Sequence, residues 1–336
     1  MFADPLCLSA GVTMGEAVVL PYEEVAYGPQ TKSQFLRLYR PGSSSSSGKP
    51  TLWVVIHGGF WKKRFTVDTS LVHTLPSFLT EQGHCVAMIE YRKVGEPGGG
   101  WPGCNIDIIL ALNKLHDMSC TRNDCPFSTG QTVLVGHSAG GSLALWVACS
   151  GSEGSLRKFQ DRFLSGGAAS PPLPLQLQLP LSLVVAVAPI CDLREGQELY
   201  RLSDEGDAIA RYLACYKEYG GSRGVASSSN CCGRSPKSVA ATADELPEQY
   251  AYASPSDNMP LGVDTMLVAG EDDDTIPVKS VEDFYYRYGV DRRSAQLSYL
   301  PLSSDHFQLV DAHALFPRVY TAAMEALKTR ARSDRS

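Results

Sequence analysis

The sequence TVLVGHSAGG at residues 132–141 places a serine at a sharp turn between an apolar run and a run that favours a helix. Gly136 and Gly140 flank Ser138, each two residues away. A serine in a strained turn needs neighbours without a Cβ atom, because a side chain there would collide with the backbone. Such a turn lifts the serine hydroxyl clear of the strand and leaves the Ala139 amide at a helix N-terminus, where negative charge is favoured. The pattern predicts a strand, a nucleophilic serine and a helix in succession.

Composition predicts one large globular domain that spans residues 1–336. The chain is 43% hydrophobic with a net charge of −6, and a core of this size needs no metal or disulfide. The absence of a concentrated basic stretch argues against nucleic-acid binding. No apolar run reaches the roughly 18 residues that a membrane span needs. Residues 1–20 lack a basic region ahead of their apolar stretch, so we expect no secretory signal and a cytoplasmic protein.

The ten cysteines are scattered along the chain. Cys85, Cys149 and Cys191 lie in apolar runs, which is typical of small buried side chains. Cys120 and Cys125 do not match the spacing of a common zinc site. We therefore expect reduced cysteines, no bound metal and no cofactor.

Strands and helices alternate along much of the chain. Buried strands are predicted over residues 52–56, 85–91, 132–135, 183–189, 264–270 and 294–300. Helices are predicted over residues 71–82, 105–116, 142–149, 280–288 and 312–330. This order implies a mostly parallel sheet with right-handed crossovers and helices on both faces. Short runs at 17–20 and 35–39 predict antiparallel edge strands before it.

Two stretches interrupt the alternation and are predicted to be insertions. Residues 151–180 are punctuated by prolines and low in complexity. Residues 194–258 are long and irregular, with a helical piece at 208–219 and a Ser/Gly/Cys loop at 220–235. By position, this second insertion lies where a lid could cover a site. The core of the domain is then about 15–150, 181–193 and 259–330.

A serine nucleophile needs a base, and the sequence supplies one far downstream. His306 comes directly after the last predicted strand and can take a proton from Ser138 and return it. A carboxylate must orient that imidazole. Four acids in a row follow strand 264–270; we choose Asp273 by position, and Asp272 and Asp274 stay open. The order serine, acid, histidine, each after its own strand, is the α/β-hydrolase order.

A second glycine turn, HGGFW at residues 57–61, directly follows the buried strand 52–56. Adjacent glycines let the backbone approach a ligand and turn N–H groups outward. We expect the amides of Gly59 and Phe60 to form an oxyanion hole with that of Ala139.

Aromatic residues near these turns are candidates for substrate binding. Trp61 and Trp101 could stack on an aromatic leaving group, and packing between loops is the alternative for each. His57 and His137 adjoin the two turns, and the motif order gives them structural parts rather than catalytic ones.

The combination of HGGFW at 57–61 and GHSAGG at 136–141 resembles the esterase/lipase branch of the α/β-hydrolases. More narrowly, it resembles kynurenine formamidases (arylformamidases) and related small carboxylesterases. The resemblance covers about residues 50–320. It implies the α/β-hydrolase fold, a triad and oxyanion hole made of the residues named above, and no cofactor.

These observations predict a metal-independent serine hydrolase. We expect an acyl-enzyme at Ser138, formed from a small carboxylic ester or an aryl formamide, with N-formylkynurenine as the leading single substrate. A peptidase of the same fold and a non-catalytic binding protein of this fold are the alternatives. The expected partner is a small-molecule substrate, and the oligomeric state is left open, with a homodimer as one candidate.

Overall fold

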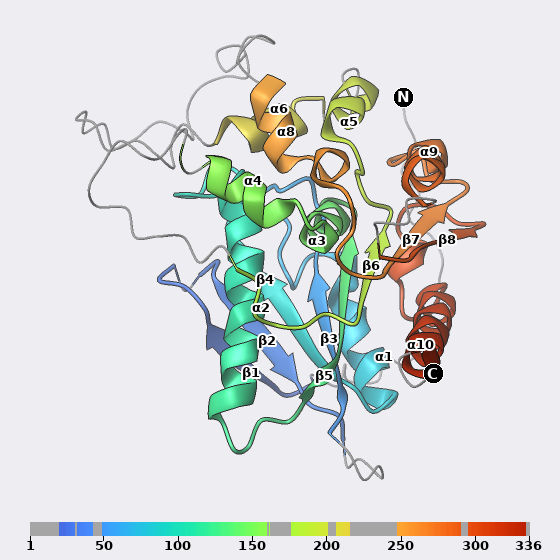
Figure 1. Cartoon of the computed structure of the whole chain (residues 1–336). Coiled ribbons are helices and arrows are strands. Elements are labelled where there is room, and N and C mark those ends of the chain that lie inside the picture. The colour runs from blue at the N-terminus through green and yellow to red at the C-terminus, as the bar shows by residue number, and fades with distance from the viewer. Residues whose placement is uncertain are drawn as a thin grey trace, which may run out of the picture.

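A computed structural model describes residues 20–30, 32–42, 49–159, 161, 176–200, 206–215, 247–289 and 295–333. Its strands are β1 (Tyr22–Ala26), β2 (Phe35–Tyr39), β3 (Thr51–Ile56), β4 (Cys85–Glu90), β5 (Ser128–His137), β6 (Leu183–Val187), β7 (Thr265–Gly270) and β8 (Leu297–Leu302). They form one sheet in the order β1-β2-β4-β3-β5-β6-β7-β8 (Figure 1). The β1–β2 and β2–β4 pairs are antiparallel and the other pairs are parallel. The mostly parallel sheet predicted from the sequence is therefore confirmed.

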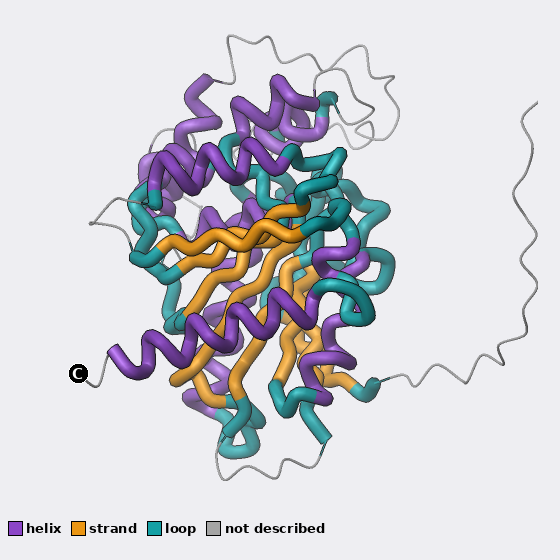
Figure 2. Tube along the Cα trace, turned by 90° about the vertical axis from the view of Figure 1, so that its right-hand side faces the viewer, coloured by secondary structure: helices purple, strands orange, loops and turns teal. Residues whose placement is uncertain are grey.

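Helices cover both faces of this sheet (Figures 1 and 2). They are α1 (Leu75–Glu81), α2 (Gly103–Thr121), α3 (Ala139–Ala148), α4 (Ser152–Phe159), α5 (Leu193–Tyr200), α6 (Ala208–Ala214), α8 (Pro247–Ala253), α9 (Val278–Tyr288) and α10 (Phe316–Ser333). Short 3-10 turns, η1, η4 and η5, span Leu71–Thr74, Pro255–Asn258 and Gln308–Val310. On one face, α1 and α10 pack over β3, where Trp53 contacts Phe316 and Tyr320 with ring centroids 6.5 and 5.5 Å away.

Burial explains why the central strands read as continuous apolar runs. Every residue of β4, β6 and β7 is buried, and so is every residue of β3 after Thr51. Parallel strands covered by helices on both faces have no solvent side, so both alternating sets of side chains are apolar. The ends of these strands are thereby held rigidly, and the loops that follow them are positioned by the core.

Two elements near the chain's periphery were not predicted from the sequence. The first described strand is Tyr22–Ala26, and residues 17–19 of the strand predicted at 17–20 lie outside the described residues. Its charged, half-exposed sequence YEEVA suits an edge strand and forms no apolar run. The stretch 151–180 was predicted to be a low-complexity insertion, and helix α4 lies at its beginning. That helix buries Leu156 and Phe159, three residues apart on one face.

A cluster of short helices lies beyond the carboxyl ends of the central strands. Helices α5, α6 and α8 contact one another, and α4 contacts α8 (Figure 1). All but α4 belong to the stretch 194–258 that was predicted to hold a lid. The loop at 220–235 lies outside the described residues, and closure over a site stays a prediction.

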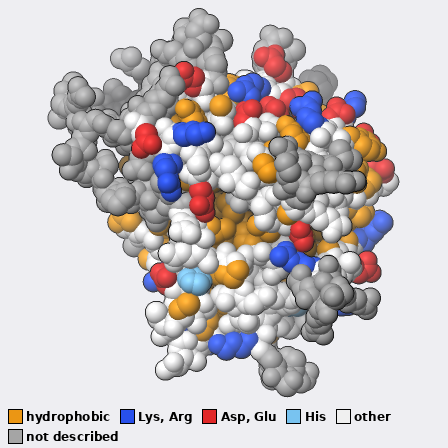
Figure 3. All heavy atoms as spheres, viewed as in Figure 1, with side chains coloured by type: hydrophobic (Ala, Val, Ile, Leu, Met, Phe, Trp, Pro, Cys, Tyr) orange, Lys and Arg blue, Asp and Glu red, His pale blue; other side chains and the backbone are white. Residues whose placement is uncertain are grey.

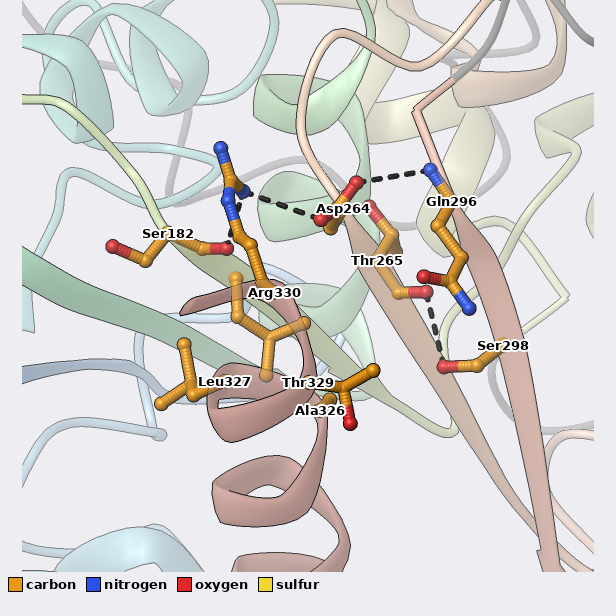
Figure 4. A pocket seen from close by; sticks show the side chains of 10 residues that line it. Ser182, Asp264, Thr265, Gln296, Ser298, Ala326, Leu327, Thr329 and Arg330 are labelled. Carbon is orange, nitrogen blue, oxygen red and sulfur yellow. Dashed lines mark hydrogen bonds and ion pairs between the residues drawn. The ribbon is translucent and has the colours of Figure 1, made fainter. Parts of the chain in front are cut away.

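The opposite end of the sheet carries a small pocket of about 110 Å³ (Figure 4). It lies where β6, β7 and β8 begin, and its lining includes Ser182, Asp264, Gln296 and Arg330. Arg330 donates to the Ser182 carbonyl oxygen at 2.8 Å and lies 3.3 Å from Asp264. Because the predicted catalytic residues follow the carboxyl ends of strands, this pocket is separate from their site.

Acidic and basic side chains are mixed on the face shown in Figure 3, around a band of hydrophobic side chains. Among the described residues, no helix combines the length and apolar character needed to traverse a bilayer.

Candidate active site

The turn between β5 and α3 holds Ser138 in a conformation that side chains seldom adopt, with φ 56° and ψ −122°. Close backbone packing on both sides explains the flanking glycines. A Cβ atom on Gly136 would lie 2.1 Å from the Gly140 carbonyl oxygen. A Cβ atom on Gly140 would lie 2.4 Å from the carbonyl oxygen of Ile56 and 2.5 Å from that of His57. The turn is therefore packed directly against the end of β3.

Backbone hydrogen bonds fix this turn from two sides. The Ser138 amide donates to the carbonyl oxygen of Val187 at the end of β6 (2.8 Å). Its own carbonyl oxygen accepts from Ser142 at 2.9 Å, which opens α3. Ala139 is the first helical residue, so its N–H has no acceptor within the helix and is available to an anion.

The HGGFW loop lies against the same turn. A Cβ atom on Gly58 would lie 2.7 Å from the His137 carbonyl oxygen and 2.9 Å from Ser138 Cβ. Beyond it, Gly59, Phe60 and Trp61 all have positive φ, at 112°, 50° and 55°. Two consecutive non-glycine residues with positive φ are rare, and such strain gathers at functional sites. The structure thus places the loop that carries two predicted oxyanion donors beside the serine.

His306 and Asp273 form a buried pair. His306 Nδ1 lies 2.7 Å from Asp273 Oδ2, and the side chains are 4% and 0% exposed. A carboxylate can only accept, so Nδ1 carries the proton and Nε2 is left as the base. The other carboxylate oxygen accepts from the amides of Thr275 and Ile276, at 2.8 and 2.7 Å. The acid is thus fixed on both oxygens before any substrate binds.

This geometry decides between the three adjacent aspartates. Asp272 and Asp274 are exposed, whereas Asp273 is buried on the imidazole. All three follow β7 on one turn, and only the tertiary fold distinguishes them.

His137 links the serine turn to the histidine loop. Its Nε2 lies 2.9 Å from the backbone carbonyl oxygen of His306, and the two rings are 4.6 Å apart between centroids. Within the described part of the chain, no hydrogen bond joins the Ser138 hydroxyl directly to the imidazole of His306. Catalytic hydrogen bonds are often loose in unliganded enzymes and tighten in the substrate complex.

The two predicted substrate-binding tryptophans are both buried in this structure. Trp61 is 1% exposed and stacks on Tyr212 of α6, with centroids 4.3 Å apart. Trp101 is 0% exposed and meets Trp146 and Phe159 edge to face. Both indoles therefore have packing positions, which was the alternative for each, and substrate contact by either stays a prediction.

A buried polar cluster beneath the HGGFW loop was missed in the sequence. His57 Nε2 lies 3.3 Å from Glu90 Oε1, and Lys93 also pairs with this carboxylate. The second oxygen of Glu90 accepts from the Val67 amide at 2.9 Å. Glu90 therefore connects His57, directly after β3, with Val67 farther along the chain. A charged residue at the end of an otherwise apolar strand was the available signal.

The cysteines predicted to be small buried side chains have that role. Cys85, Cys149 and Cys191 are buried and free, and burial raises the pKa of the Cys85 thiol to about 12. In the described ranges, no group of three or more His, Cys, Asp or Glu side chains is placed to hold a metal ion.

The two buried histidines beside the loops predict an acid sensitivity of folding. Burial lowers the pKa of His57 and of His137 from 6.5 to about 3. The nearby charge of Lys93 adds to this effect at His57, and that of His306 adds to it at His137. Between these pH values the unfolded chain binds more protons, so the free energy of unfolding falls as pH drops. Each histidine contributes a slope of about 1.4 kcal/mol per pH unit well inside this window. Urea unfolding measured from pH 7 to pH 4 tests this.

The slope identifies the contribution of each group. H137Q should lower the slope of unfolding free energy against pH by the contribution of one histidine. H313Q changes an exposed position and should leave this slope unchanged. A native slope retained in both H57Q and H137Q would show that neither imidazole is kept neutral by the fold.

Substitution of the aspartates tests the choice of acid. D273N should lower kcat by about 10,000-fold, because an amide no longer holds the imidazole tautomer. D272N and D274N should stay within about threefold, since neither exposed carboxylate lies on the imidazole. Turnover of p-nitrophenyl acetate measures all three, and a large loss in D272N or D274N with an active D273N would contradict the assignment.

Comparisons with known proteins agree with this fold. A family model described as BD-FAE matches residues 36–201, and a search of curated protein sequences found no match. Esterase B from Lactobacillus rhamnosis superposes with a TM-score of 0.65 at 20% identity, over 94% of this chain and 89% of that one. An esterase from the archaeon Pyrobaculum calidifontis has a TM-score of 0.57 at 16% identity, over 93% and 86%.

A truncated carbohydrate esterase from gut microbiota matches with a TM-score of 0.58 at 14% identity, over 91% of this chain and 95% of that one. The narrower resemblance to kynurenine formamidases is not shown by these comparisons. The sheet order and these structural neighbours show that the chain has the α/β-hydrolase fold, and the family model matches the part of it from residue 36 to residue 201.

Proposed function

We propose that this protein is a serine carboxylesterase that hydrolyses small carboxylic esters through an acyl-enzyme at Ser138. The observation that carries the proposal is the 2.7 Å contact between Asp273 and His306, buried beside the strained serine turn. Binding alone needs neither a buried acid–imidazole pair nor a strained serine, so this arrangement supports catalysis over a binding role.

Acylation follows from the placement of these groups. The Ser138 hydroxyl attacks the ester carbonyl carbon while His306 Nε2 takes its proton. The resulting imidazolium is stabilised by Asp273 at the other ring nitrogen. Collapse of the tetrahedral intermediate breaks the bond to the alcohol, which leaves with the proton from Nε2.

Deacylation repeats these steps with water. His306 takes a proton from the water as its oxygen attacks the acyl carbon, and the proton returns to Ser138 Oγ as the acid departs. In both halves the negative charge develops on the carbonyl oxygen. The amides of Gly59, Phe60 and Ala139 are proposed to hold that oxygen, and one such donor is worth about 3 kcal/mol of transition-state stabilisation.

The leaving group is the finer part of the proposal. Esterases are among the structural neighbours, and esterase B from Lactobacillus rhamnosis also matches in a form inhibited by a tributyrin phosphonate. These relatives support ester substrates. An aryl formamide, with N-formylkynurenine as the test compound, would use the same acyl-enzyme with a formyl group. The cytoplasmic location and the homodimer stay predictions.

A substrate panel tests the proposal. We expect p-nitrophenyl acetate and butyrate to turn over, and S138A to lower kcat by about a million-fold, as loss of a triad nucleophile does. N-formylkynurenine in the same panel decides whether formamides are accepted. S150A is the matched control, because Ser150 is exposed just beyond the end of α3 and its hydroxyl donates to the Pro260 carbonyl oxygen, away from the Ser138 turn.

The results of this panel distinguish the candidate activities. Turnover of esters without turnover of the formamide would leave a general esterase and reject the narrower substrate. Ester turnover that survives in S138A would reject the serine mechanism. Activity confined to aminopeptidase substrates would support a peptidase of this fold.

A further inference from the structure

His137 contacts each of the three loops on which the proposed reaction depends. It precedes Ser138 in the turn itself. Its Nε2 lies 2.9 Å from the backbone carbonyl oxygen of His306. Its Nδ1 lies 3.3 Å from the place where a Cβ atom on Gly58 would stand, so the ring also borders the oxyanion loop.

The hydrogen bond fixes the chemical state of this ring. A carbonyl oxygen can only accept, so Nε2 carries the proton and donates it to the His306 carbonyl. Nδ1 then keeps its lone pair, and it faces the backbone of Gly58. The imidazole is 6% exposed and can act as a rigid, uncharged spacer.

Neutrality matters because of what the ring faces. His306 becomes an imidazolium during acylation, with its ring centroid 4.6 Å from that of His137. A positive charge at His137 would oppose that step, whereas a neutral donor to the backbone does not. The negative charge of Asp273 lies on the far side of His306, at Nδ1.

We propose that His137 is a positioning residue that sets the distance between the serine turn and the loop of the general base. It touches no reacting atom and acts by holding the His306 backbone. The inference rests on the proposed function, because His306 is a general base only if Ser138 is the nucleophile.

The experiment compares H137Q with H137N. The Gln amide nitrogen can reach the position of the imidazole Nε2, while the shorter Asn amide cannot, and both side chains are polar and uncharged. H137N should lower kcat for p-nitrophenyl acetate about 10-fold with KM nearly unchanged, and H137Q should recover most of that loss. A 10-fold loss corresponds to about 1.4 kcal/mol, the upper range for one net hydrogen bond.

A second measurement does not depend on the substrate. Amide hydrogen exchange over residues 303–307 should be faster in H137N than in the native protein, and H137Q should restore the slow exchange. Labelling of Ser138 by a fluorophosphonate should slow in parallel with kcat.

The results distinguish two failures. Equal kcat in H137N, H137Q and the native protein, with equal exchange over 303–307, would overturn the role of His137. A native protein that neither turns over esters nor reacts with the fluorophosphonate would overturn the proposed function instead, and the exchange comparison would then decide alone whether His137 holds the loop.

Discussion

Backbone-to-backbone contact between the end of β3 and the serine turn is the constraint on which the site depends. The carbonyl oxygens of Ile56 and His57 lie so close to Gly140 that a single Cβ atom could not fit. Gly58 meets the turn just as closely from the other side. Strand β3 pairs with β5 in parallel, so the loop after β3 and the serine turn after β5 lie at the same end of the sheet and contact each other there. The fold thus brings the nucleophile and the loop of the predicted oxyanion hole together without any side chain between them.

The hydrophobic core maintains the strained backbone conformation of Ser138. Ser138 has φ 56°, and such a conformation costs about 1–3 kcal/mol, which the surrounding structure must impose. The buried strands on both sides supply a rigid frame, and the bond from the Ser138 amide to Val187 ties the turn to a third strand. The backbone of Ser138 is thereby held in place beside the loop after β3.

Several of the titratable groups buried around the turn pair with one another or with backbone groups. Asp273 holds His306, and His137 holds the backbone of that same residue. On the other side, Glu90 accepts from the Val67 amide and contacts His57. Buried polar networks of this kind are rigid only when each member has a partner, because an unpaired group in a low dielectric is costly. The site is therefore organised before substrate arrives.

The glycines at 136 and 140 could be understood from the sequence because their requirement is local: no Cβ atom fits beside a strained serine. The mostly parallel sheet with helices on both faces could also be predicted, since alternating strands and helices leave few topologies. Asp273 could be chosen by position, but its neighbours could not be excluded, because that depends on which of three side chains contacts a histidine 33 residues away. Trp101 was ambiguous for a related reason. Its ring is buried by Trp146 and Phe159, whose positions only the fold reveals.

Strand β1 and Glu90 were missed because neither fits a search for apolar runs. An edge strand carries charges, and a buried carboxylate interrupts the apolar pattern that marks a central strand.

Direct detection of the acyl-enzyme tests the central claim most sharply. The protein would be mixed with a short-chain activated ester and quenched in acid within the first turnovers. It would then be digested, and the masses of its peptides would be measured by mass spectrometry. The account predicts one acyl group, carried by Ser138. An adduct on another residue, or ester turnover with no covalent adduct at any time point, would contradict it.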